Sequence, residues 1–72
     1  MTTATLTARE RHVIRKAGQI WPHLARLSER ALSDRHGARQ ARRVVARCAL
    51  YGSIAGWSGL EAQDLARLAE GP

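Results

Sequence analysis

The stretch that decides the fold is Ala38-Arg39-Gln40-Ala41-Arg42-Arg43-Val44-Val45-Ala46-Arg47-Cys48-Ala49-Leu50-Tyr51-Gly52-Ser53-Ile54-Ala55-Gly56-Trp57. At helical spacing, its first half is apolar on one side and carries four arginines on the other. Its second half carries no charge. A helix that is apolar on one face lies at a surface, and one that is apolar all round lies between neighbours. The stretch therefore predicts a central helix whose second half is buried on every side.

The length of the chain allows one small domain. We expect a single helical domain over residues 1–72, with a disordered tail at residues 1–6. Chains this short bury a small share of their surface and often depend on a disulfide, a metal ion or a partner subunit. Cys48 is the only cysteine, so no disulfide forms within the chain, and its apolar neighbours favour a buried thiol. A homodimer would complete such a small core.

The charge of the chain is strongly positive and uneven. Twelve lysine and arginine residues face six acidic residues, a formal net charge of +6. Residues 1–57 hold eleven basic residues against three acidic ones, a balance of +8, whereas residues 58–72 hold one against three, a balance of −2. Such a surplus favours an anionic partner, most often a nucleic acid, and arginine matches phosphate geometry well. The alternative is a coding bias that supplies arginine as an ordinary solvating residue.

Residues 8–33 have the apolar period of one helix. Thr7 and Glu10 have the spacing of a capping box at its start. The apolar residues that follow recur at threes and fours: Val13, Ala17, Ile20, Trp21, Leu24, Leu27 and Ala31. Pro22 interrupts them but lies on the polar face, so we expect a kinked continuous helix. The alternative is two helices, with Pro22 at the first position of the second.

A turn signal and a second capping box divide the rest of the chain. Residues 33–37, Ser-Asp-Arg-His-Gly, predict a short link between antiparallel helices. The helix from about 38 to 56 should bury one arc: Ala41, Val44, Val45, Cys48, Ala49 and Ala55. Ser58 and Glu61 form a second capping box, which begins a short amphipathic helix. The expected fold is all-α: an antiparallel helical hairpin, its first helix kinked or split at Pro22, plus a short C-terminal helix, three to four helices in total.

Glycines and tryptophans mark the expected packing sites. Gly52 and Gly56 stand four residues apart, a spacing that lets helix backbones approach closely. We interpret them as a packing notch, with a dimer seam as the alternative. Trp21 lies on the apolar stripe, and Trp57 can pack over the first turn of the last helix. Both are expected at a helix contact or dimer interface rather than stacked on bases.

The sequence lacks the pattern of an enzyme, and we expect no catalytic residue, metal ion or cofactor. The six carboxylates lie at helix caps or on exposed faces. His12 and His23 would be about 16 Å apart along one helix, too far for one metal ion. No apolar run reaches the roughly 20 residues that span a bilayer, and residues 1–8 lack the apolar core of a signal peptide. We therefore expect a cytoplasmic protein with no membrane segment.

Arginines are the candidate binding residues. They cluster at the start and on one side of the second long helix, and two on the first helix widen the patch: Arg35, Arg39, Arg42, Arg43 and Arg47, with Arg26 and Arg30. Arginines that neutralise phosphates release counterions, which makes binding salt-dependent. The predicted function is a nucleic-acid-binding module, with DNA favoured over RNA, that acts as an accessory or transcription regulator.

Two alternatives remain open: an inhibitor or adaptor that docks on the acidic surface of a larger complex, and a helical-hairpin RNA binder. The placement of the basic residues discriminates between the functions. A face shared by both long helices favours phosphate tracking, whereas scattered positions favour solvation or protein docking.

Two short segments resemble parts of helix-turn-helix domains. Leu6-Thr7-Ala8-Arg9-Glu10-Arg11-His12-Val13-Ile14 resembles the opening of the LuxR-type domain. That family's glycine turn and recognition helix do not follow, because Pro22 and Leu24 stand where the turn should begin. Residues 59–69 look like the first helix of a generic helix-turn-helix, again without a recognition helix after it. We interpret both as shared helix capping and assign no family.

Overall fold

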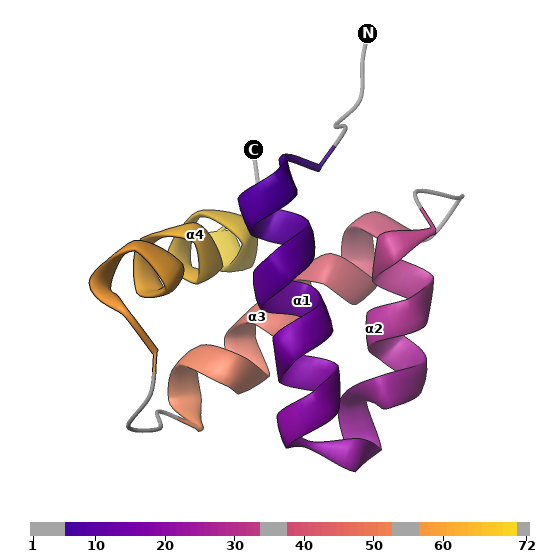
Figure 1. Cartoon of the computed structure of the whole chain (residues 1–72). Helices are drawn as coiled ribbons and strands as arrows, with labels where there is room; N and C mark the ends of the chain where they lie inside the picture. The colour runs from indigo at the N-terminus through magenta and orange to yellow at the C-terminus, as the bar shows by residue number, and fades with distance from the viewer. Residues whose placement is uncertain (1–5, 34–37, 53–56, 71–72) are drawn as a thin grey trace, which may run out of the picture.

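The computed structural model describes residues 6–33, 38–52 and 57–70. In these ranges the chain forms α1 (Ala8–Ile20), a 3-10 turn η1 (Pro22–Leu24), α2 (Ala25–Leu32), α3 (Ala38–Tyr51) and α4 (Gly59–Glu70). Figure 1 shows α1 in front, α2 and α4 on either side of it, and α3 crossing behind. α3 packs against all three other helices, as a helix between neighbours should, and so does α1. No strand occurs in the described ranges, and the all-α fold is confirmed.

The chain splits into two helices at Pro22, so the prediction of one continuous helix was wrong and the alternative is correct. Trp21 is extended, with φ −117° and ψ 100°, because a proline ring clashes with a helical backbone at the preceding residue. Pro22 then opens the 3-10 turn, in which the amide of Leu24 donates to the carbonyl of Trp21 at 2.8 Å. As a result, α2 folds back beside α1 (Figure 1).

Three contacts hold α2 antiparallel to α1. The hydroxyl of the buried Ser28 donates to the carbonyl of Ile14 at 2.7 Å. Arg11 donates to the carbonyl of Leu32 at 3.2 Å, at the end of α2, where helix carbonyls have no partner within the helix. Gly18 lies directly against Ser28, since a Cβ on Gly18 would be 2.8 Å from Ser28 Cβ. The two helices therefore touch at a glycine.

The core consists of medium-sized and small side chains. Val13, Ile14, Val45 and Leu65 are the largest fully buried ones. Alanines fill most of the remaining space: Ala17, Ala31, Ala41, Ala46, Ala49 and Ala69. Because alanine is small, the helices approach one another closely.

Two residues at the edges of this core differ from their predicted places. Leu6 is buried, although the sequence analysis assigned it to a disordered tail. Ile20 is 39% exposed rather than buried, because α1 ends there and the chain turns away at Trp21. The apolar stripe of residues 13–31 therefore does not act as one continuous surface.

The buried side of α3 is rotated from its predicted position. Ala41, Val45 and Ala49 are buried as predicted, whereas Val44 is 39% exposed and Cys48 is exposed. The buried arc extends instead to Ala38, Arg42 and Ala46. Nor is the second half of α3 buried all round, since Tyr51 is 85% exposed. The reason is that the other three helices pack on one side of α3 instead of surrounding it. The predicted burial of Ala55 lies outside the described residues.

Gly18→Ala is expected to lower the free energy of unfolding. The new Cβ would lie 2.8 Å from Ser28 Cβ. Relieving such an overlap typically costs about 1–3 kcal/mol, which outweighs the roughly 1 kcal/mol that alanine gains over glycine within a helix. Urea unfolding followed by circular dichroism measures the change. Gly59→Ala is the matched control, because nothing lies within 4 Å of a Cβ at that position in α4. Equal stability of the two variants would contradict the close packing of α1 on α2.

Candidate functional site

The outward side of α3 carries a row of arginines. Arg39, Arg43 and Arg47 are exposed and recur at intervals of four, so they lie along one side of the helix. α3 contains no acidic residue, and no carboxylate in the described part of the chain forms an ion pair with any of the three. Like charges at this spacing destabilise a helix by a few tenths of a kcal/mol. The row therefore lowers the stability of α3, and none of its three arginines makes a described contact that would compensate for this loss.

A hollow lies beside the arginines on the same helix. Its volume is about 230 Å³, and its lining residues are Gln40, Arg43, Val44 and Arg47. Gln40 supplies an amide that can donate and accept hydrogen bonds, and the two arginines supply only donors. Val44 adds an apolar surface. We call the set Arg39, Gln40, Arg43, Val44 and Arg47 the arginine face of α3.

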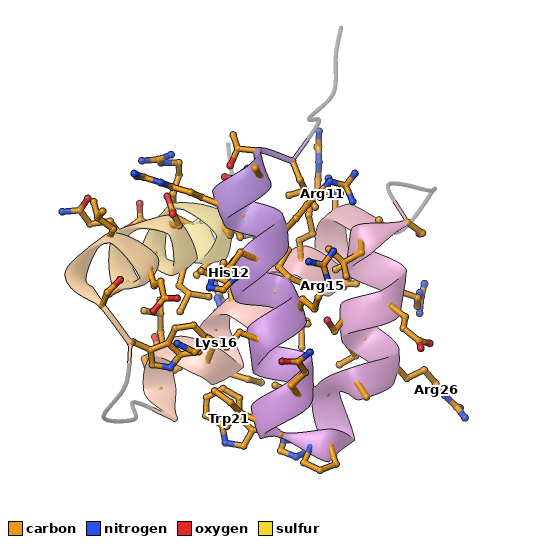
Figure 2. The ribbon with its side chains drawn as sticks, viewed as in Figure 1. Arg11, His12, Arg15, Lys16, Trp21 and Arg26 are labelled. Atoms are coloured by element: carbon orange, nitrogen blue, oxygen red, sulfur yellow. The ribbon has the colours of Figure 1, made fainter. Side chains whose placement is uncertain are left out.

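The other predicted binding residues do not belong to the arginine face. Arg42 is only 9% exposed and has a partner, so its side chain belongs to the packed side of α3. Arg26 and Arg30 are exposed on α2, and Figure 2 shows Arg26 pointing away from the molecule. Arg35 lies outside the described residues. Of the seven predicted arginines, the structure thus brings together Arg39, Arg43 and Arg47.

Basic residues of α1 lie on a different side of the molecule. In Figure 2, Arg11 and Arg15 leave α1 on the side of α2 in the front layer, whereas α3 passes behind α1. The outward side of α3 faces away from α1, because its inward side packs against α1, α2 and α4. The two long helical segments therefore do not form one shared basic track, and any anion-binding site depends on α3.

A cluster of two tryptophans joins the ends of α1 and α3 to the start of α4. Trp21 and Trp57 stack with ring centroids 6.3 Å apart, and Lys16 Nζ lies 4.7 Å from the centroid of the Trp57 ring. A Cβ on Gly52 would be 3.0 Å from Trp21 Cζ2. Trp21, Trp57 and Gly52 thus make packing contacts within one chain. Gly56 lies outside the described residues, and a dimer seam at these positions stays a prediction.

Glu61 fixes α4 to α1. Its carboxylate accepts from the amide of Ser58 at 2.9 Å, and its own amide donates to the Ser58 hydroxyl at 3.1 Å, which completes the predicted capping box. The same carboxylate lies 2.8 Å from His12 Nε2 and accepts from Lys16 Nζ at 3.2 Å. The hydrogen bonds from the Ser58 amide and from His12, and then that from Lys16, lower the pKa of Glu61 from 4.5 to about 2. His12 and Lys16 both leave α1 on the side of α4 (Figure 2).

Glu61 and Asp64 of α4 pair with residues other than those of the arginine face. Glu61 engages His12 and Lys16 of α1, and the buried Asp64 lies 3.8 Å from Arg67 within α4. In the part of the chain that the structure describes, no group of three His, Cys, Asp or Glu side chains could hold a metal ion. The arginine face thus gathers three exposed arginines that form no ion pair among the described residues.

Comparison with known proteins adds no family to this description. No protein-family model matches the chain, and neither a curated protein nor a solved structure matches it. Among the described helices, none is long and apolar enough to cross a membrane.

Sequence reasoning missed Gln40 and Val44 as members of this site. Both were overlooked because the predicted buried arc of α3 was centred one helical position away from the real one. The spacing of the alanines could have shown which side of α3 faces inward. Ala38, Ala41 and Ala49 share one line with Val45, and small residues mark the side on which helices approach closely. With that line inward, Gln40, Val44 and Arg47 face outward.

Glu61→Gln is expected to lower stability at neutral pH and to leave it unchanged near pH 2. Glutamine keeps the capping box but removes the charge that pairs with Lys16, a loss of about 0.5–1 kcal/mol. Because the pKa of Glu61 is lower in the folded protein than in the unfolded chain, its charge stabilises the fold fully above about pH 4.5, and this contribution is lost as the pH falls towards about 2. Thermal unfolding of both proteins between pH 7 and pH 2 measures it. A difference that stays constant with pH would exclude the charge as its cause.

Proposed function

We propose that this protein is a small, basic nucleic-acid-binding module of the cytoplasm, a DNA-binding accessory or transcription regulator. It binds phosphates through Arg39, Arg43 and Arg47 of α3. The observation that carries the proposal is the exposed row of three arginines on a helix without an acidic residue. A chain of phosphates offsets the mutual repulsion of the row, because each arginine then has an anionic partner.

The expected salt dependence is large enough to measure. Three neutralised phosphates give a slope of about −2.7 in a plot of log affinity against log salt, so affinity falls about 40-fold between 50 and 200 mM salt. A homodimer that presents two arginine faces would double the slope. The slope and the mass of the protein in solution together give the number of faces that bind.

A second candidate function is an inhibitor or adaptor that docks on an acidic protein surface. Tyr51, which is 85% exposed, and Val44, which is 39% exposed, favour it because they place apolar surface next to Arg43 and Arg47. Tyrosine and arginine are enriched in protein interfaces. The absence of a basic track shared by α1 and α3 also favours protein docking. We still rank this function second, because three arginines in a row along α3 fit a repeating anion better than they fit a mixed protein surface.

Replacing both Arg43 and Arg47 by alanine is expected to weaken binding to duplex DNA and to reduce the salt slope by about 2, since each phosphate contact contributes about 1. Fluorescence anisotropy with a labelled duplex at several salt concentrations measures both quantities. Both side chains are exposed on α3, so the variant should fold normally.

The matched control replaces Arg9 and Arg15, which are also exposed but lie on α1. It changes the net charge equally and should leave the slope almost unchanged. Equal losses in the two variants would make the arginines a general solvating charge. No binding by the unaltered protein at 50 mM salt would overturn the proposal, and a search for an acidic protein partner would follow.

A further inference from the structure

α3 exposes about half of its circumference. Arg39, Gln40, Arg43, Val44, Arg47, Cys48 and Tyr51 are all exposed. At about 100° per residue, Gln40, Val44, Arg47 and Tyr51 fall within a sector of roughly 60° near the middle of this outward arc, and Arg39 lies at one edge. The other three helices pack on the opposite side. The outward side of α3 is therefore a ridge that can enter a groove.

The width of α3 decides which groove of a double-stranded nucleic acid this ridge can enter. An α-helix with its side chains is about 10–12 Å across, and α3, with its 14 residues, is about 21 Å long. The major groove of B-form DNA is about 12 Å wide, whereas the minor groove is about 6 Å wide. The major groove of double-stranded RNA is too narrow and deep for side chains to read, and its wide minor groove is too shallow to enclose a helix. Of these grooves, the major groove of duplex DNA alone admits α3.

The scarcity of exposed aromatic residues argues against a single-stranded ligand. Proteins that bind single strands stack successive bases on several aromatic side chains. Trp21 and Trp57 stack on each other and are partly buried, so neither offers a free ring face to a row of bases. Tyr51 is exposed, but one ring cannot hold a row of bases.

We infer that α3 docks in the major groove of duplex DNA, with Gln40 against a base edge and Arg39, Arg43 and Arg47 on the phosphates that border the groove. This inference rests on the proposed function and adds to it the form of the ligand and the reading residue. A glutamine amide pairs with N6 and N7 of adenine. Val44 lies beside Gln40 in the lining of the hollow, where the methyl group of a thymine would make an apolar contact.

The groove is tested with chemically modified duplexes. The protein is titrated with one duplex in three forms: unmodified, with cytosines replaced by glucosylated 5-hydroxymethylcytosine, and saturated with the minor-groove ligand netropsin. Glucose fills the major groove without changing the phosphates. The expected result is a loss of affinity of tenfold or more on glucosylated DNA and little change with netropsin.

The possible outcomes separate the inference from the function on which it rests. Salt-dependent binding that tolerates glucose would overturn docking in the major groove and leave phosphate binding in place. A loss with netropsin alone would assign the minor groove instead. Absence of binding to every duplex at 50 mM salt would overturn the proposed function as well, and the inference with it.

The reading residue is tested by selection from a library of random duplexes with Gln40→Ala and, as the matched control, Gln63→Ala. Both glutamines are exposed on helices, so both variants should fold. Gln40→Ala is expected to keep the salt slope but to lose a preference of about tenfold at one adenine position, which Gln63→Ala retains. If the unaltered protein enriches no motif, or if Gln40→Ala enriches the same motif, Gln40 does not read a base.

Discussion

The backbone restriction that Pro22 imposes on Trp21 determines the arrangement of the whole molecule. The extended conformation of Trp21 ends α1 and sends α2 back along it, where Gly18 and Ser28 allow the two helices to touch. α1 and α2 then lie as a pair on the same side of α3, and α4 completes that side. A continuous helix through residue 22 would have spread these residues along one rod. The open side of α3, and with it the arginine face, is thus a consequence of one proline.

The sequence predicted the helical class and both capping boxes, because these features depend on short-range spacing. Thr7 with Glu10 and Ser58 with Glu61 make the reciprocal hydrogen bonds that their spacing indicates. It did not predict the outward exposure of Val44 and Cys48. A hydrophobic pattern says how wide the buried arc of a helix is, whereas its phase depends on which neighbours pack against it. On α3 the alanines set that phase, and their weak hydrophobicity hid it.

Net charge alone gives a poor measure of the charge that a ligand would meet. Arg11 supports the end of α2, Lys16 pairs with Glu61 and covers Trp57, and Arg42 is buried with a partner. These three basic residues serve the fold. Glu61 and Asp64 of α4 likewise pair with residues outside α3. Three basic residues therefore stabilise the fold, whereas Arg39, Arg43 and Arg47 are exposed on a helix without an acidic residue.

The contact between Gly18 and Ser28 has a consequence for how this chain can evolve. Ser28 Oγ lies within 2.9 Å of the place where a Cβ on Gly18 would be, so the two positions share one small volume. Glycine has no side chain to give up, so compensation can run in one direction only: a Cβ at position 18 requires that residue 28 lose its own side chain. Contacting residues of this kind do not contribute independently to stability. Descendants of this chain should therefore keep glycine at position 18 unless position 28 becomes glycine, whereas Gly59 should vary without a partner.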